Sequence, residues 1–307
     1  MEIKKILILS QSALMLLPSL ERSMEEFNGG FKVSFKSDFT FEEADLIFLD
    51  YTYLKNEEGK YKSALEYVPK LALLTALVDH NGINEILKET KVEHLFGLSG
   101  ANSFSDIRDF IITFFNKQFW TADTFCKNPL KVSEMSFLSS EGIFDSIQEL
   151  LSGHDFSECF EGIEDYLTQV LNESILNAIF NAPVDDMGSH MFKRMNKKTI
   201  IHMIPGKEPV VKLLTDPKKI VISIKDFYGT LTRNDIYDYL PLGEIREKEG
   251  GAGIGMYLIF KYSHKFVINI QPRKFTEMIF VIDKDKRFKW YSSKEKSFHL
   301  FMPNEEF

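Results

Sequence analysis

Short apolar runs alternate with helical patterns along the first 120 residues of the chain. Four runs are apolar almost throughout, which is typical of strands buried on both faces. Between them, apolar residues recur at every third or fourth position, as in helices that pack one face. Strands alternating with helices predict a parallel sheet covered on both sides. The expected strands are residues 5–9, 45–49, 71–78 and 92–98, and the expected helices are residues 13–27, 61–68, 83–89 and 105–119.

The pattern changes between residues 120 and 131, where periodicity is lost around Asp123, Asn128 and Pro129. This loss predicts a domain boundary, since linkers are rich in such turn-forming residues. The expected parts are a first domain at 1–120, a linker at 121–130, a second domain at 131–285 and a C-terminal extension at 286–307.

The second domain combines a few helices with a run of strands, which predicts a two-layer α/β sandwich with a mixed sheet. The charged stretch 284–296 is expected to be a solvated loop. The expected strands are residues 131–138, 199–203, 209–214, 220–225, 264–270 and 277–283, and the expected helices are residues 143–151, 160–180 and a segment after Gly255.

The composition favours a folded, water-soluble protein. Of the 307 residues, 44% are hydrophobic and 27% are charged, and the net charge is −8. A negative chain is a poor non-specific ligand for nucleic acids or anionic membranes, because both present phosphates. The N-terminal apolar run ends at Ser10, well short of a membrane span. Cys126 and Cys159 lack metal-ligand spacing, so we expect reduced thiols in a cytoplasmic protein.

The segment 160–180 carries a polar pair beside its apolar stripe. Glu173 and Asn177 are four residues apart and therefore share one face of the expected helix. An asparagine oxygen can bind Mg²⁺, and a glutamate can orient or deprotonate a water or hydroxyl. Taken alone, the pair is better explained as the polar edge of an amphipathic helix.

Asp226 ends the apolar strand expected at 220–225 and is followed by Gly229. A carboxylate at a strand end can accept a hydrogen bond from the exocyclic amine of adenine and so reject guanine. An ordinary turn aspartate is the alternative.

Residues 250–255 contain four glycines directly before an apolar run that reads as a helix start. Such a turn can bind phosphates on its backbone N–H groups. No Lys-Ser or Lys-Thr follows the last glycine, so the segment is not a Walker A loop, and the charged residues 244–249 before it replace the strand that opens a Rossmann unit. A flexible hinge is the alternative, but the two upstream motifs favour phosphate binding.

In this order, the three motifs resemble the ATP-binding domain of the GHKL superfamily, named for gyrase, heat-shock chaperone, histidine kinase and MutL. Within it, the anti-sigma-factor serine kinases are the most similar, and the resemblance covers residues 131–283. It rests on segments 171–182, 221–226 and 251–255. The family usually has glycines where Tyr228 and Thr230 stand, so we expect the turn around Gly229 to differ from that of the family.

The resemblance implies a role for each matching residue. Glu173 would be the general base, and Asn177 would hold Mg²⁺ through ATP. Asp226 would select adenine beside the turn at Gly229. The residues implied at the phosphates and near the adenine are Gly251, Gly253, Gly255 and Thr276.

The implied function is a signalling protein that binds ATP and Mg²⁺ and phosphorylates a serine on a regulatory partner, such as an anti-anti-sigma factor. A switch that binds nucleotide and docks partners without catalysis is the alternative. Whether ATP is transferred, hydrolysed or only bound stays open. A histidine kinase is disfavoured, because no helical hairpin accompanies His154.

The first domain more loosely resembles the flavodoxin-like receiver domain of response regulators. Residues 45–50 match its third strand, which ends at the phospho-acceptor, here Asp50. Ser10 and Gln11 replace the expected acidic pair, so Mg²⁺ has little to hold it beside Asp50. We therefore expect a pseudo-receiver that binds or dimerises, with a homodimer as one outcome and Asp50 vestigial.

Overall fold

The computed structural model describes residues 4–10, 31–34, 40–56, 62–76, 80–98, 102–240 and 254–302. Gly251, Gly253 and the helix expected at 13–27 lie outside these ranges. Both parts of the chain contain helices and strands, which confirms the α/β class. The chain forms two compact units, Met1–Gln118 with Glu295–His299, and Phe119–Lys294 with Leu300–Phe307.

The first unit is built on a parallel sheet whose central strands β3 and β4 are buried on both faces. Neighbouring strands pair in parallel in the order β2, β1, β3, β4, β5. Leu46–Asp50 and Leu71–Thr75 are buried at every position, as their unbroken apolar sequence predicts. The strands are β1 (Lys4–Leu9), β2 (Phe31–Ser34), β3 (Leu46–Asp50), β4 (Leu71–Thr75) and β5 (His94–Gly97).

The helices of this unit are α2 (Tyr51–Asn56), η2 (Lys62–Lys70), α3 (His80–Thr90) and α4 (Asn102–Phe115). The apolar stripes of α3 and α4 are buried, as expected from their spacing. The helix expected at 61–68 is instead a 3₁₀ segment that contains Pro69 and is broken at Tyr67. Proline lacks the N–H that an α-helix would need there.

A strand from the end of the chain completes this unit. Residues 297–299 of β11 (Ser297–Phe301) pair antiparallel with β5, through Phe298 opposite Leu95 and His299 opposite His94. The Ser297 hydroxyl also accepts the Gly97 N–H at 3.1 Å. Part of the expected C-terminal extension is therefore core structure of the first unit.

The second unit contains an antiparallel sheet in the order β9, β10, β8, β7, β6. The prediction of a mixed sheet is wrong for these strands, because every neighbouring pair among them is antiparallel. The strands are β6 (Lys131–Ser136), β7 (Val210–Thr215), β8 (Lys219–Asp226), β9 (Lys265–Gln271) and β10 (Phe275–Asp283).

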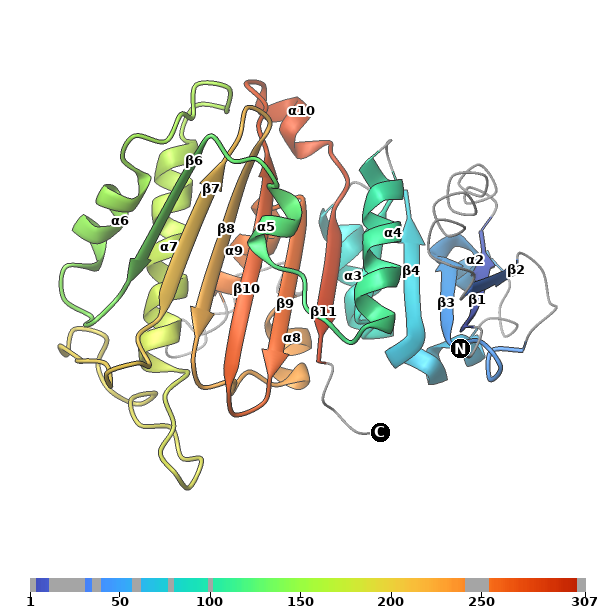
Figure 1. Ribbon diagram of the computed structural model, residues 1–307, viewed down its shortest axis with the longest axis horizontal. Coiled ribbons are helices and arrows are strands. Elements are labelled where there is room, and N and C mark those ends of the chain that lie inside the picture. The colour runs from blue at the N-terminus through green and yellow to red at the C-terminus, as the bar shows by residue number, and fades with distance from the viewer. Residues whose placement is uncertain are drawn as a thin grey trace. The chain divides into compact units, whose positions relative to one another are not determined.

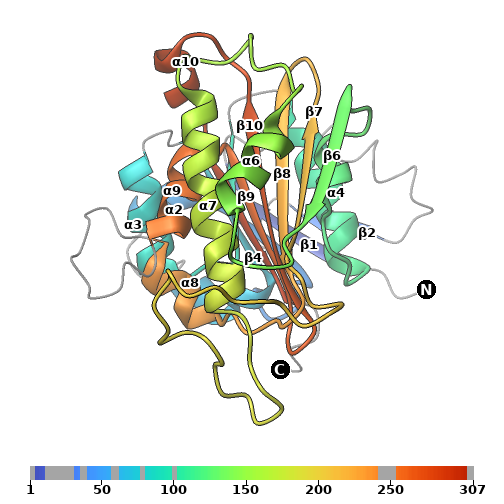
Figure 2. The same cartoon turned by 90° about the vertical axis from the view of Figure 1, so that its left-hand side faces the viewer.

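Helices α6, α7 and α9 cover one face of this sheet, and the short helix α5 lies on the other (Figures 1 and 2). The bounds of α6 match the prediction, whereas α7 begins three residues later than expected and α9 begins one residue before Gly255. The helices are α5 (Ala122–Phe125), α6 (Ile143–Leu151), α7 (Ile163–Phe180), α8 (Arg233–Tyr239), α9 (Ile254–Tyr262) and α10 (Phe288–Ser292).

Three expectations for the second unit are corrected. Residues 199–203 form no strand; His202 makes only an isolated bridge to Ser139. The expected linker contains α5 and buries Phe125 and Cys126. The charged stretch 284–296 contains α10 and is not a solvated loop. Its Tyr291 is buried and donates a hydrogen bond to the Tyr262 carbonyl. One buried aromatic residue thus holds in place a segment whose many charges predict a solvated loop.

Among the helices described, none combines the length and apolar character that crossing a lipid bilayer requires.

Candidate functional site

A cavity of about 150 Å³ lies in the second unit between α7, α9 and the strands β8 and β10. Asn177, Asp226 and Thr276, three of the residues singled out from the sequence, line it together. Met256 and Ile259 of α9 contribute apolar surface. A cavity of this size accommodates a small aromatic group.

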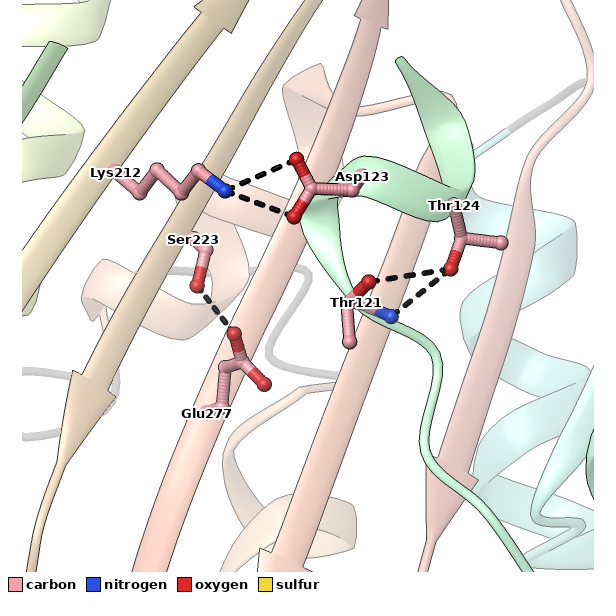
Figure 3. A network of polar contacts seen from close by, with 6 residues as sticks. All are labelled: Thr121, Asp123, Thr124, Lys212, Ser223 and Glu277. Atoms are coloured by element: carbon pink, nitrogen blue, oxygen red, sulfur yellow. Dashed lines mark hydrogen bonds and ion pairs between the residues drawn. The ribbon is translucent and has the colours of Figure 1, made fainter. Parts of the chain in front are cut away.

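The strand register explains why Asp226 and Thr276 meet. The two residues are directly opposite each other in the antiparallel pair β8–β10. Successive side chains of a strand point to opposite faces, so the even-numbered residues here face the cavity. Ser223 and Glu277 lie on the other face, near α5, where the Ser223 hydroxyl donates to Glu277 at 2.6 Å (Figure 3).

In the part of the chain that the structure describes, only one oxygen of the Asp226 carboxylate accepts hydrogen bonds of normal geometry. Its Oδ1 accepts the backbone N–H groups of Tyr228 at 2.9 Å and Gly229 at 3.1 Å. Among the described residues no hydrogen bond of normal geometry reaches its Oδ2, although the Thr276 hydroxyl and N–H lie near the carboxylate and favour its charged form. Burial raises the pKa of Asp226, and the two N–H groups oppose that rise. Oδ2 is thus an acceptor available to a ligand in the cavity.

Gly229 is required by the turn after β8. Its φ of +62° is in the left-handed region, and a Cβ here would collide with the Gln271 carbonyl oxygen. The same Cβ would lie 3.0 Å from the Arg273 nitrogen. This glycine therefore permits the close approach of the β9–β10 turn.

Replacing Gly229 with Ala should lower the free energy of unfolding by about 2 kcal/mol or more, since the strained φ and the collision add. Gly206→Ala is the matched control, because its φ is +81° and nothing lies within 4 Å of an added Cβ. This control should cost only about 1 kcal/mol. Urea unfolding followed by circular dichroism measures both, and equal losses would contradict the collision.

Tyr228 and Thr230, which replace glycines of the resembling family, both take part in packing. The Tyr228 side chain is buried. The Thr230 hydroxyl donates to the Ala182 carbonyl at 3.0 Å and so ties the turn to the end of α7. The turn is therefore held by side chains where the family has glycines.

Two hydroxyls in the cavity lack partners. Ser174 and Thr276 are 1% and 3% exposed, both line the cavity, and neither hydroxyl makes a hydrogen bond of normal geometry. The Thr276 hydroxyl lies beside the Asp226 carboxylate and favours its charged form. A buried hydroxyl without a partner costs about 1–3 kcal/mol. Two such groups in one cavity indicate a site that a polar ligand completes.

The sequence motifs did not single out Ser174, because its neighbour Glu173 carries the motif on this helix. Its signal is a serine inside the apolar stripe of α7, between Leu171 and Ala178. A hydroxyl in such a stripe must find a partner or remain unsatisfied.

Asn177 and Glu173 have partners of their own. The Asn177 Oδ1 accepts a hydrogen bond from the Asn181 amide at 2.9 Å. Glu173 does not line the cavity, and its Oε2 is 3.7 Å from the Lys197 Nζ. The structure therefore brings Asn177 together with Asp226 and Thr276, while Glu173 stands one helical turn away in an ion pair.

The residues that could hold a metal are few. The described part of the chain contains no cluster of three His, Cys, Asp or Glu side chains suited to a metal ion. Asn177 offers a single amide oxygen. Such a ligand suits Mg²⁺ that takes its remaining oxygens from phosphates and water.

The glycine-rich segment is described only at its end. Gly255 lies in the first turn of α9, next to the cavity residue Met256. Gly251 and Gly253 lie outside the described residues.

A second, larger cavity of about 550 Å³ adjoins the first, and the two share His190 and Thr230. It is more polar, with Lys207 and Arg273 among its lining residues. The Lys207 Nζ donates to the Phe227 carbonyl at 2.7 Å.

Asp50 of the first unit is buried and fully hydrogen-bonded. Its Oδ2 accepts from the Ser10 hydroxyl at 3.1 Å, and its Oδ1 accepts from the Thr52 hydroxyl at 2.7 Å and the Thr52 N–H at 3.0 Å. Phosphorylation of Asp50 would first have to break these bonds.

His154 is fixed between strands of the second unit. Its Nε2 is 2.9 Å from the Ser133 hydroxyl, and its Nδ1 is 2.8 Å from the Thr215 hydroxyl. Burial, with the charges of Lys131 and Lys284, lowers the pKa of His154 to about 4. The imidazole is therefore neutral and buried, unlike a phospho-acceptor on an exposed helix.

A scan against protein-family models found no match for this chain, and a search of curated proteins found no relative of significant similarity.

Proposed function

We propose that the second unit binds ATP, with the adenine ring in the cavity between α7 and β8. The observation that carries this proposal is the meeting of Asp226, Thr276 and Asn177 in one cavity whose buried hydroxyls lack partners. Adenine carries an amine beside a ring nitrogen. The Asp226 Oδ2 accepts from the amine, and the Thr276 hydroxyl donates to the ring nitrogen.

This pairing selects adenine over guanine. Guanine presents a carbonyl where adenine has its amine, and that oxygen would face the Asp226 carboxylate. Leaving a buried charged acceptor against another acceptor costs more than leaving either in water. The preference therefore follows from a single oxygen atom.

The ribose and phosphates extend out of the cavity, whose volume suits a small aromatic group such as the base alone. Asn177 lies on the α7 side, where it would share Mg²⁺ with the phosphates and water. Mg²⁺ held there would supply neutralisation of the phosphate charge. The first turn of α9 adds a helix N-terminus, which favours anions.

We further propose that the terminal phosphate passes to a serine on a partner protein: the serine oxygen bonds to the terminal phosphorus while the bond from that phosphorus to the ADP oxygen breaks, and ADP leaves. Glu173 would take the hydroxyl proton once it is released from Lys197. The antiparallel sheet with α6, α7 and α9 on one face supports a GHKL-type domain. The parallel strand order β2, β1, β3, β4, β5 supports a flavodoxin-like, receiver-type first unit.

A switch without catalysis is the second candidate. It is favoured by Glu173 being held in an ion pair and by Asp50 having both oxygens engaged. In this version, nucleotide binding alone changes how the protein docks a partner.

Replacing Thr276 with Val tests the nucleotide site. The variant should lower the free energy of unfolding of the ligand-free protein by about 1 kcal/mol, because it removes the hydroxyl that favours the charged form of the buried Asp226 carboxylate. It should also weaken ATP binding about 10-fold, since the hydrogen bond to the ring is lost. Thermal melting with Mg-ATP and with Mg-GTP measures both effects, because a ligand that binds only the folded form raises the melting temperature.

Ser223→Ala is the matched control, since its hydroxyl is satisfied by Glu277 on the other face of the sheet. It should destabilise the protein and leave the shift with Mg-ATP unchanged. Two results for the unaltered chain would refute the proposed site: a melting temperature that rises as much with Mg-GTP as with Mg-ATP, or one that changes with neither nucleotide.

A further inference from the structure

The segment that joins α7 to β7, residues 181–209, contains no regular helix or strand but is anchored at both ends; we name it the strap. Figure 2 shows it leaving the end of α7. At its start, the Ala182 carbonyl accepts the Thr230 hydroxyl. Towards its end, the Ser140 hydroxyl donates to the Thr199 carbonyl at 3.1 Å and accepts the Ile201 N–H at 2.9 Å. Between these anchors, Lys193 and Lys197 lie near α7.

The middle of the strap is strongly basic in a chain of net charge −8. Four cations fall within six residues: Lys193, Arg194, Lys197 and Lys198. Lys193 lines the cavity that also contains Asn177, and Lys197 pairs with Glu173. Of the described residues around this cavity, Lys193 is the one with a permanent positive charge.

Fold stability does not account for these two lysines. Lys193 makes no hydrogen bond or ion pair with the described residues. The Lys197–Glu173 pair is 3.7 Å long, and both side chains are 30–40% exposed. Exposed pairs of this kind contribute about 0–1 kcal/mol. An anion with more charge than one carboxylate would therefore compete successfully for Lys197.

We propose that Lys193 and Lys197 bind the phosphates of the nucleotide, and that the terminal phosphate draws Lys197 away from Glu173. This inference rests on the proposed ATP site. Lys193, at the cavity, contacts the phosphates nearer the ribose. Lys197 pairs with Glu173, which lies one turn of α7 from the cavity residue Asn177, and so contacts the terminal phosphate.

The exchange regulates the candidate base. With ADP or no nucleotide, Lys197 stays on Glu173 and occupies its carboxylate. With ATP, the lysine moves to the terminal phosphate and Glu173 is free to accept a proton. The protein thus distinguishes ATP from ADP by whether Lys197 pairs with the terminal phosphate or with Glu173.

Isothermal titration with adenosine, Mg-ADP and Mg-ATP tests the inference on Lys193→Ala and Lys197→Ala. Lys197→Ala should weaken ATP binding about 10-fold and leave ADP within about twofold, because only ATP reaches this residue. Lys193→Ala should weaken both nucleotides about 10-fold. Adenosine binding should stay within about twofold in every variant, since it carries no phosphate.

Lys198→Ala is the matched control, as an exposed lysine on the same strap that lines neither cavity. It should bind all three ligands like the unaltered chain. Two outcomes would overturn the phosphate contacts if the chain still binds adenosine. In one, Lys193→Ala and Lys197→Ala leave the ATP affinity unchanged; in the other, Lys198→Ala lowers it as much as they do. If the unaltered chain binds neither adenosine nor ATP, the proposed function itself fails and this inference fails with it.

Discussion

Asp226→Asn should weaken ATP binding about 100-fold, because it replaces a charged acceptor with a donor at the adenine amine. The asparagine Oδ1 can keep the N–H groups of Tyr228 and Gly229, so the turn is preserved. Its amide nitrogen then takes the place of Oδ2 and faces the amine, donor against donor. Isothermal titration with Mg-ATP measures the loss.

The same variant should reverse the preference between ATP and inosine triphosphate. Inosine carries a carbonyl at the position of the adenine amine, and the new amide can donate to it. The unaltered chain should prefer ATP, because the carboxylate repels that carbonyl. A reversed ratio could not come from general damage to the fold.

Asp216→Asn is the matched control for this experiment. Asp216 is also a turn aspartate, whose Oδ1 accepts the N–H groups of Lys218 at 2.6 Å and Lys219 at 2.7 Å, but it does not line the cavity. Its nucleotide affinities should stay within about twofold. Unchanged ATP affinity in Asp226→Asn would remove the adenine contact from the account.

Glu173→Gln should slow phosphate transfer or hydrolysis by about 100-fold to 10,000-fold, because it removes the proton acceptor. ATP affinity should be unchanged or slightly higher, since Lys197 loses its carboxylate partner and is free for the phosphates. Release of inorganic phosphate from Mg-ATP gives the rate, and titration gives the affinity.

Glu164→Gln, at an exposed position in the first turn of the same helix, is the control and should leave the rate unchanged. A rate in Glu173→Gln equal to that of the unaltered chain would show that another group accepts the proton. ATP binding by the unaltered chain without any turnover would favour the switch over the kinase.

Local pattern predicted most elements of this fold, because each apolar run or stripe carries its own signal. Helix α6 was predicted to the residue, since its apolar stripe lies between Gly142 and Ser152. Helix α8 was missed, although Thr232 and Asp235 form a capping box that the sequence displays. Strand β11 was missed for another reason, since its partner β5 lies some 200 residues away and no local pattern indicates that pairing.

The candidate site was predictable to the extent that its residues stand on regular elements. Asp226 and Thr276 meet through the strand register, and Asn177 follows from the face of α7. Ser174 was hidden beside Glu173, and Lys193 depends on the path of the strap. That path is set by side-chain anchors such as Ser140, which no periodicity reveals.

The ATP site is the central claim, and the position of the bound base tests it most directly. A crystal structure of the unaltered chain with Mg²⁺ and a non-hydrolysable ATP analogue should place the adenine amine within hydrogen-bonding distance of the Asp226 Oδ2 and a ring nitrogen beside the Thr276 hydroxyl. An analogue bound elsewhere on the chain, with this cavity filled only by water, would contradict the account.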